Sequence, residues 1–276
     1  MGKIQLVTDS TAYFTKEDAA RLDIKVVPLS VTFSGETKDE GFPGEFEDFY
    51  NKLQTSTDFP STSQPSIEAF AKVYEEILAE GNEAITLVIS AKLSGTYNSA
   101  SVAAEHTAPD KISVIDSETS VANLKLLVLR AIDLAKAGYS RLEIVNMLEE
   151  EKKKATISLT VDTLEYLRRG GRLSSAQAII GSLLNVKPVI ALIDGSLQPV
   201  GKVRGKNKAL EFMYGRIPEH AKHITVCHIL NEDEAEKIRE ELQRRFRNAR
   251  VTVDVIGPVI GSHLGPKAIG ICSMWT

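Results

Sequence analysis

Residues 84–116 read AITLVISAKLSGTYNSASVAAEHTAPDKISVID, and this stretch contains the pattern that decides the fold class. Ala84–Ser90 is a short apolar run, as in a strand that is buried on both faces. A helical pattern follows from about Gly95 to Glu105, and Ile112–Asp116 is a second strand-like run. Strand–helix alternation of this kind predicts a mainly parallel sheet with helices on both faces.

The same alternation extends on both sides of this stretch. Apolar residues recur at helical spacing after Ser66, which has the position of an N-cap, and Ser140 and Glu143 form a capping box before another helix. The remaining elements expected in this half are strands at Ile4–Thr8 and Lys25–Phe33 and a long helix at Val121–Ala137.

The pattern changes after the charge run EEEKKK at residues 149–154, which we interpret as a solvated helix end and a domain boundary. Strands are expected at residues 156–161, 188–193 and 198–203, and Asp194-Gly195 is a hairpin signal between the last two. Two more strands, at 224–229 and 251–256, flank the amphipathic helix Glu232–Phe246. We therefore expect an α/β domain over residues 1–154 and an α+β domain with a more antiparallel sheet over residues 155–276.

The composition is that of a folded globular protein, with 43% hydrophobic and 25% charged residues in a chain of 276. A formal net charge of −4 argues against a nucleic-acid-binding protein, which would usually have a positive excess. Cys227 and Cys272 are far apart in apolar segments, so we expect two small buried side chains and no disulfide framework or zinc site. The start lacks the apolar core of a signal peptide, and no apolar stretch reaches the ~20 residues that span a bilayer. A cytoplasmic location is expected.

Hydroxyl-rich loops follow the predicted strands of the first half. They are Asp9-Ser10-Thr11, Ser90–Thr96 and Asp116–Thr119, and a fourth polar loop, Ser61–Ser66, precedes a helix. In open α/β sheets, ligands bind beyond the carboxyl ends of the strands, and hydroxyls near helix N-termini favour an anion. Each serine or threonine alone is more simply explained as an N-cap. The four loops together predict a site for a small acidic ligand.

Other site chemistries have little support in the sequence. There is no GxxxxGK[ST] and no GxGxxG after a strand, and the five histidines have no metal-ligand spacing. The segment RRGGR at residues 168–172 is most simply a turn with solvated arginines. His263 differs because it lies in GSHLGPKAIG (residues 261–270), where glycines let the backbone approach a ligand closely. We expect this loop to belong to a site.

Several short motifs follow one another along the chain in the order that is typical of one family. They are VTDST (7–11), TSQPS (62–66), SGTYNSA (94–100), VIDS (114–117), LRRGGRLS (167–174), KP (187–188), GKVRGKNKA (201–209) and HLGPKAIG (263–270). From end to end, the chain resembles the DegV family. That family is similar to the fatty-acid-binding subunits of bacterial fatty acid kinase, which hold one fatty acid and present its carboxylate to a separate kinase that makes an acyl phosphate from ATP.

The resemblance implies a DegV-like fold with a lipid site between the two domains. It implies a carrier without enzymatic activity that serves phospholipid synthesis, with a long-chain fatty acid as ligand and no cofactor or metal. The implied partner is the catalytic subunit of the kinase, and transient contact with a membrane surface is compatible with this role.

The resemblance also implies roles for individual residues. Thr62, Ser94 and His263 would bind the carboxylate, Arg172 would support them together with Ser63 and Gly95, and Arg204 would lie on the surface that meets the kinase. Lys267 stands where the family usually has a glycine, which affects the backbone after His263 and adds a cation near the entrance.

The chemistry of these residue types agrees with a carboxylate. A buried carboxylate must be hydrogen-bonded, and hydroxyls and an imidazole can do this without the bidentate grip of an arginine. The acyl chain would supply affinity at ~0.8 kcal/mol per buried methylene. The expected walls, each of which is equally well explained as ordinary core, are Leu93, Ile179, Ile180, Leu183, Leu184 and Ile190.

Two alternatives stay open at this point. One is a serine hydrolase with Ser94 as nucleophile, His263 as base and Asp116 as the residue that orients it. The order matches α/β-hydrolases, but SGTYN lacks the GxSxG elbow. The other alternative is an interaction module for a different anion, such as a phosphorylated metabolite.

Overall fold

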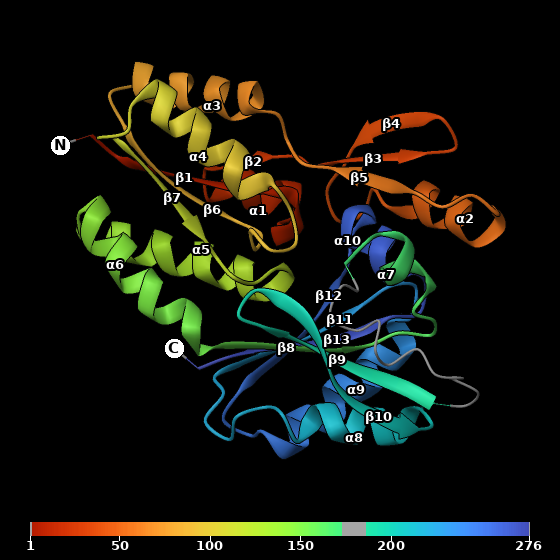
Figure 1. Cartoon of the computed structure of the whole chain (residues 1–276). Coiled ribbons are helices and arrows are strands. Elements are labelled where there is room, and N and C mark those ends of the chain that lie inside the picture. The colour runs from red at the N-terminus through yellow and green to blue at the C-terminus, as the bar shows by residue number, and fades with distance from the viewer. Residues whose placement is uncertain (1, 173–185, 276) are drawn as a thin grey trace.

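The structure is a computed structural model and describes residues 2–172 and 186–275. Its strands form three sheets, which we call A, B and C (Figure 1). Sheet A belongs to the first half of the chain and sheet C to the second half. Sheet B is small, and its three strands follow the second strand of sheet A in the sequence.

Sheet A has the strand order β2-β1-β6-β7, and all its strands are parallel. Its strands are β1 (Ile4–Asp9), β2 (Ile24–Val27), β6 (Glu83–Val88) and β7 (Ile112–Asp116). Its helices are α1 (Lys16–Arg21), α3 (Ile67–Ala79), α4 (Thr96–Thr107), α5 (Val121–Lys136) and α6 (Arg141–Glu151).

Helices cover both faces of sheet A, as predicted. Val7 and Val88 pack with α3 and α4, whereas Leu6 and Leu87 pack with α5 and α6 on the opposite face (Figure 1). This division follows from the alternation of side chains along a strand. The predicted capping box is confirmed at the start of α6.

Sheet C has the order β10-β9-β8-β13-β11-β12, and only the pair β11–β12 is parallel. Its strands are β8 (Ala155–Thr160), β9 (Val186–Ile193), β10 (Ser196–Arg204), β11 (His223–His228), β12 (Arg250–Val255) and β13 (Ile269–Met274). Helices α8 (Lys206–Tyr214) and α9 (Glu232–Arg245) cover one face of this sheet. The mainly antiparallel arrangement confirms the expected fold class.

The hairpin signal between β9 and β10 is confirmed. Asp194 and Gly195 both have positive φ, of 48° and 74°. Two such residues form the type of two-residue turn whose twist matches that of the flanking strands.

Sheet B was not predicted. It is antiparallel, with the order β4-β3-β5, and consists of β3 (Ser30–Phe33), β4 (Glu36–Asp39) and β5 (Ser61–Ser63), with α2 (Glu47–Thr55) beside it. The expected single strand Lys25–Phe33 is therefore wrong. The chain leaves sheet A after Val27, at Pro28, which lacks the N–H that a continuing ladder needs.

The segment around His263 is also not the loop that the glycines suggested. Helix α10 (Pro258–Leu264) begins with Pro258 at its first turn and ends at Gly265, which has φ 74°. Proline is favoured at the first helical position and glycine just past the last one, so this sequence has ordinary helix boundaries. A short helix, α7 (Glu165–Arg169), packs against α10.

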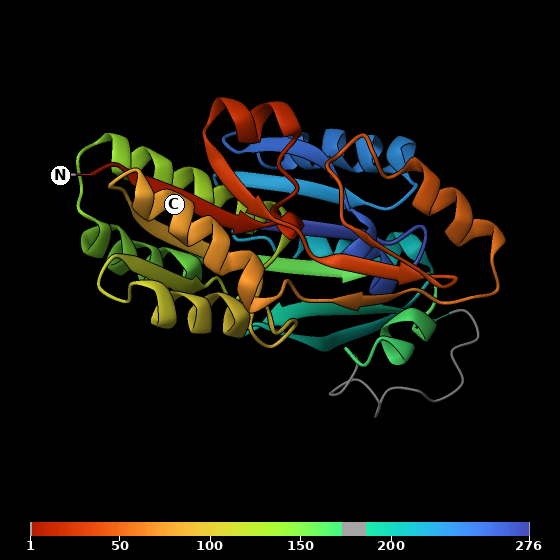
Figure 2. The same cartoon turned by 90° about the horizontal axis from the view of Figure 1, so that it is seen from above.

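Figures 1 and 2 agree that sheet B lies over one face of sheet C with α10 between them. Two side chains from the first half of the chain fix α10. Glu40 accepts hydrogen bonds from Val259 N (2.7 Å) and from the Ser10 hydroxyl (2.6 Å), and the Tyr50 hydroxyl donates to the carbonyl of Ile256. A side chain at Gly261 would collide with the Tyr50 hydroxyl. The position of His263 therefore depends on contacts made by the N-terminal half.

Glu40 makes the stability of this arrangement depend on pH. Burial raises the pKa of Glu40 from 4.5 to about 7. The carboxyl group of Glu40 therefore holds its proton more tightly in the folded chain than in the unfolded chain. The contribution of Glu40 to the free energy of unfolding is fully present below pH 4.5 and is lost as the pH rises through 7.

We expect Glu40→Gln to remove this dependence, because glutamine keeps an acceptor for Val259 N and does not ionise. Between pH 4.5 and 7, the wild type should lose about 1 kcal/mol per pH unit relative to the variant, measured by urea unfolding. The exposed Glu76→Gln serves as the control and should follow the wild type. If the free energy of unfolding depends on pH in the same way in the wild type and in Glu40→Gln, the raised pKa of Glu40 is contradicted.

Candidate functional site

A largely apolar cavity lies between sheet C, α10 and β5. The space inside it that a water-sized sphere can enter is about 90 Å³, and its mouth is partly open to solvent. Most of its lining residues are leucine, isoleucine or valine, and Cys227 and Cys272 also reach it. Both cysteines are buried and free, as expected, with their sulfur atoms 3.7 Å apart.

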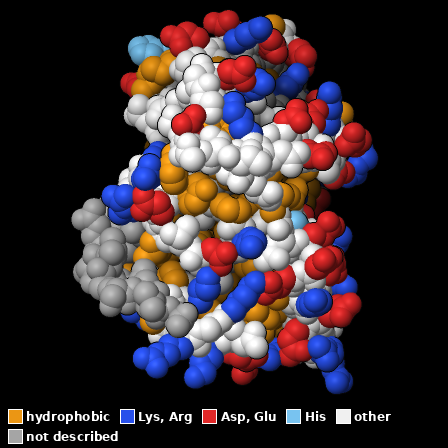
Figure 3. Space-filling model, turned by 90° about the vertical axis from the view of Figure 1, so that its right-hand side faces the viewer, with side chains coloured by type: hydrophobic (Ala, Val, Ile, Leu, Met, Phe, Trp, Pro, Cys, Tyr) orange, Lys and Arg blue, Asp and Glu red, His pale blue; other side chains and the backbone are white. Residues whose placement is uncertain are grey.

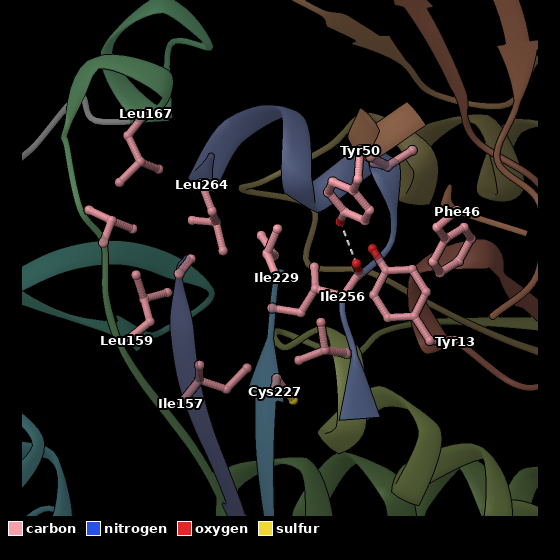
Figure 4. Close-up of a cluster of buried hydrophobic side chains, with 14 of the residues drawn as sticks. Tyr13, Phe46, Tyr50, Ile157, Leu159, Leu167, Cys227, Ile229, Ile256 and Leu264 are labelled. Carbon is pink, nitrogen blue, oxygen red and sulfur yellow. Dashed lines mark hydrogen bonds between the residues drawn. The ribbon is translucent and has the colours of Figure 1, made fainter. Parts of the chain in front are cut away.

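The walls of the cavity come from segments that are remote in the sequence. Ile157 and Leu159 are two residues apart in β8 and so share the face of sheet C that is turned away from α8 and α9. Leu264 of α10 and Ile256 face them. Figure 4 shows these four side chains pointing toward the same region, with Cys227 at its lower end.

Thr62 and His263 meet at this cavity. The hydroxyl of Thr62, in β5, lies 2.8 Å from Nε2 of His263, in the last turn of α10. Both residues line the cavity, whereas Ser63, the next residue of β5, is exposed and does not. Successive residues of a strand point to opposite sides, which accounts for the difference.

The imidazole of His263 is neutral at pH 7. Burial, and to a smaller extent the charge of Arg172, lowers its pKa from 6.5 to about 4. Nδ1 is buried and has no hydrogen-bond partner among the described residues. A side chain at Gly170 would overlap this nitrogen, so the close packing of α7 against the imidazole requires glycine there. A neutral imidazole has one donor and one acceptor, so the pair with Thr62 can form in either direction.

Arg172 supplies positive charge to the same cavity. Its Nε donates to the carbonyl of Leu93 (3.3 Å) and its Nη1 donates to the carbonyl of Gly170. Burial lowers the pKa of Arg172, but an arginine stays charged near pH 7. With His263 neutral, the polar part of the lining combines one cation with several hydroxyls.

Ser94 reaches the cavity from the loop between β6 and α4. Its Oγ lies 2.8 Å from Oγ1 of Thr96. Gly95 beside it packs so closely against Gln64 that a side chain there would overlap the amide. Gln64 donates to the hydroxyl of Ser99 (2.9 Å), so this contact ties the segment after β5 to the start of α4.

The hydroxyl-rich loops do not all converge on the cavity, which corrects the interpretation from the sequence. The buried carboxylate of Asp9 accepts hydrogen bonds from Thr11 N (2.8 Å) and Ile89 N (2.6 Å), and Asp116 accepts from Ala91 N (3.0 Å). These contacts join the loops at the carboxyl edge of sheet A to one another. Among residues 2–172 and 186–275, the hydroxyls that line the cavity are those of Thr62, Ser94 and Ser120.

The catalytic triad of the hydrolase alternative is not assembled. Nε2 of His263 pairs with Thr62, and Ser94 pairs with Thr96. The Oδ1 atom of Asp116 accepts from the backbone N–H groups of Ala91 and Glu118. No nucleophile–base–acid chain therefore connects these residues.

The remaining predicted residues lie in different places. Arg204 is exposed at the end of β10, outside the cavity lining. Lys267 is exposed and has φ 63°, so the residue that replaces the family glycine adopts a backbone conformation that glycine favours. Leu93 lines the cavity and Ile190 does not. The other expected wall residues lie outside the described residues: Ile179, Ile180, Leu183 and Leu184.

Sequence reasoning missed the contribution of β8 to the walls and the packing roles of Gly170 and Gln64. The alternation in TISLT, residues 156–160, could have indicated that Ile157 and Leu159 share a face. Nothing in the sequence indicates that Gly170 packs against an imidazole.

Residues 2–172 and 186–275 contain neither a helix that could span a membrane nor a cluster of metal-binding side chains. None of the described helices is long and apolar enough to cross a membrane. In the same residues, no group of three or more His, Cys, Asp and Glu side chains is placed to hold a metal ion.

Comparison with known proteins agrees with the motifs. A family model described as an uncharacterised protein of the DegV family matches residues 3–275. Protein DegV of Bacillus subtilis is 39% identical over 277 residues, which cover 98% of this chain and 98% of that protein. A DegV domain-containing protein of Halalkalibacterium halodurans is 38% identical over 277 residues, with the same coverage of both chains.

Solved structures agree as well. A DegV family protein from Thermus thermophilus, described for its fatty acid binding, has a TM-score of 0.90 and 35% identity, covering 99% of this chain and 100% of that one. DegV from Bacillus subtilis, described as a fatty acid binding protein, has a TM-score of 0.89 and 37% identity, covering all of both chains. A stearic-acid-binding protein from Eubacterium ventriosum has a TM-score of 0.86 and 29% identity, covering 100% of this chain and 98% of that one. The chain therefore belongs to the DegV family.

Proposed function

We propose that this protein is a fatty-acid-binding carrier that holds a long-chain fatty acid in the cavity and has no chemistry of its own. The observation that carries the proposal is an apolar cavity whose polar lining includes the Thr62–His263 pair, Ser94 and the cation Arg172. The fatty acids that related DegV proteins are described as binding support the same class of ligand.

The apolar walls account for the affinity. Side chains such as Ile157, Leu159 and Leu264 would remove the acyl chain from water, at about 0.8 kcal/mol per methylene. This term grows with chain length, so a long chain is favoured over a short one. The hydroxyls and the arginine alone would not distinguish chain lengths.

The polar groups account for the carboxylate. A carboxylate that enters the cavity must exchange its water for hydrogen bonds. Thr62, Ser94 and the neutral His263 offer such bonds, and Arg172 balances one negative charge. One charge suits a carboxylate better than a doubly charged phosphate monoester. We propose that Ser63 and Gly95 act indirectly, since Ser63 is turned away and Gly95 lets Gln64 approach.

The lining comes from both halves of the chain, which supports a lipid site between a domain of residues 1–154 and a domain of residues 155–276. Leu29 and Thr62 belong to the first range, and Leu159 and His263 to the second. Figure 3 shows hydrophobic side chains in a band across the face of the molecule between these two parts. We propose that the protein works in the cytoplasm and that transient contact with a membrane surface lets it exchange fatty acid.

We further propose that the protein presents the carboxylate to the catalytic subunit of a fatty acid kinase. Arg204 is exposed at the end of β10 and Lys208 is exposed nearby, which gives this surface two cations, whereas Lys206 is paired with Glu234. Such a surface fits an acidic partner. The kinase would supply the phosphoryl transfer and this chain the bound substrate.

The carboxylate contacts can be tested with Thr62→Ala and His263→Ala. Each change removes a hydrogen bond to a charged group, so we expect each to weaken the affinity for a long-chain fatty acid by about tenfold or more, measured by calorimetry on delipidated protein. Because the two side chains are bonded to each other, their effects should not add in the double variant.

Thr32→Ala is the matched control for these variants. Thr32 lies in the neighbouring strand β3, and its hydroxyl pairs with Thr37, away from the cavity. This variant should bind like the wild type. Unchanged affinity in both Thr62→Ala and His263→Ala, with the fold intact, would rule out the proposed carboxylate contacts.

The docking surface can be tested with Arg204→Glu in an assay of acyl phosphate production with a bacterial fatty acid kinase. Reversing the charge should lower production at least tenfold and leave fatty acid affinity unchanged, because Arg204 does not line the cavity. Lys111→Glu, on the surface before β7, is the control for a change in net charge. Equal production by Arg204→Glu and the wild type would exclude docking through this surface.

A further inference from the structure

Ser120 is a buried hydroxyl with no partner at the cavity wall. It is only 4% exposed and lines the cavity, and its Oγ atom has no hydrogen-bond partner among the described residues. Most buried hydroxyls in folded proteins are paired, because leaving one unpaired costs free energy. An unpaired hydroxyl at a ligand cavity indicates that its partner is the ligand.

Neighbouring hydroxyls do not share this feature. Ser90 donates to the carbonyl of Gly195 (2.8 Å), Ser94 pairs with Thr96 (2.8 Å), and Ser117 donates to the carbonyl of Thr119 (3.2 Å). The same loops therefore satisfy their other serines internally. Ser120 is the cavity-lining hydroxyl that they leave unpaired.

The backbone at this point also offers hydrogen-bond donors. Ser120 is the N-cap residue of α5, a helix of 16 residues, and its side chain does not cap the helix. The first N–H groups of a helix have no acceptor within it and carry partial positive charge. Val121, which follows and also lines the cavity, has φ 47°, a strained value for a β-branched residue. The start of α5 thus combines an unpaired hydroxyl with uncapped N–H groups.

We propose that the start of α5 binds an oxygen substituent on the acyl chain, so that the cavity takes a hydroxy or oxo long-chain fatty acid. This inference rests on the proposed function and specifies its ligand. The Ser120 hydroxyl would donate to the ligand oxygen or accept a hydrogen bond from a ligand hydroxyl. The uncapped N–H groups favour an oxygen at this place over a methylene.

The substituent is neutral rather than a second carboxylate. Arg172 is the charged side chain in the described lining, and it is bonded to the carbonyls of Leu93 and Gly170. Lys125, one turn further along α5, is paired with Asp254 (2.8 Å). No unpaired cation is therefore evident beside Ser120 in the described part of the chain, and a second buried carboxylate would lack a counter-charge.

The substituent also lies away from His263. Asn123, in the first turn of α5, donates to the carbonyl of Thr156 (3.0 Å), so Ser120 lies near the start of β8. His263 lies beside α7, which follows the other end of β8 (Figure 1). From the first to the last of its six residues, β8 extends about 16 Å, because five steps of about 3.3 Å separate them. The oxygen therefore belongs on the part of the acyl chain that passes Ser120, away from His263 and on the side of the loop that carries Ser94, since Thr119 O accepts from Ser90 N (2.9 Å).

The test compares octadecanoic acid with hydroxyoctadecanoic acids that carry the hydroxyl at successive positions along the chain. Affinities are measured by calorimetry on the full, delipidated chain. For at least one isomer, Ser120→Ala should weaken binding about tenfold relative to the wild type and leave the affinity for octadecanoic acid unchanged. The active isomer then reports how far Ser120 lies from the carboxylate site.

Ser101→Ala is the matched control, because Ser101 Oγ is also buried and unpaired but does not line the cavity. It should change neither affinity. If Ser120→Ala does not fold, Ser120→Cys carries the same comparison, since a thiol is a weaker hydrogen-bond donor of similar size.

For each isomer, the affinity for the hydroxylated acid is divided by the affinity for octadecanoic acid. If this ratio is the same in the wild type and in Ser120→Ala for every isomer, the inference is overturned. That result would mean that Ser120 is satisfied by a buried water, for which the unpaired Oδ1 of Asn123 could be a second partner. It would leave the proposed function intact as long as plain fatty acids bind. Failure of all the acids to bind the wild type would instead remove the proposed function.

Discussion

A hydrogen bond of 2.8 Å between Thr62 and His263 joins two side chains that are 201 positions apart in the sequence. The rest of the site depends on this contact, because it holds β5 against α10 at the cavity. It forms only if α10 is fixed correctly, which Glu40 and Tyr50 do from the first half of the chain. It also requires a glycine at position 170, because any side chain there would overlap the imidazole. The contact therefore links packing in both halves to the chemistry of the cavity.

The electrostatics of the site follow from burial. Because the pKa of His263 is lowered to about 4, the imidazole acts as a neutral hydrogen-bonding group at pH 7, and Arg172 provides the positive charge. This arrangement can hold a single carboxylate without a bidentate grip, since Arg172 also bonds two carbonyls of the chain. On the proposal that a kinase acts on the bound fatty acid, hydroxyls and a neutral imidazole would hold the carboxylate less rigidly than a bidentate arginine would.

The sequence predicted the parallel sheet A, its helices and the mainly antiparallel sheet C, because long apolar runs and helical spacing are strong local signals. It did not predict sheet B, whose strands have three or four residues and few buried side chains, or β13, whose sequence IGICSM has no clear alternation. The glycines around His263 suggest a loop, although Pro258 and Gly265 are ordinary helix boundaries. Only the family motifs predict a common site for Thr62, Ser94, Arg172 and His263. Their common cavity depends on contacts between distant segments, which no local pattern contains.

The central claim is that the cavity holds a long-chain fatty acid, and native mass spectrometry of the gently purified protein from a bacterial host tests it most directly. The account predicts a species heavier than the chain by one long-chain fatty acid, which solvent extraction releases and mass analysis identifies. Leu93→Trp, which places a large side chain at a partly exposed lining position, should fold and lose that mass. A wild type that is folded, free of ligand and unable to take up added fatty acid would contradict the account.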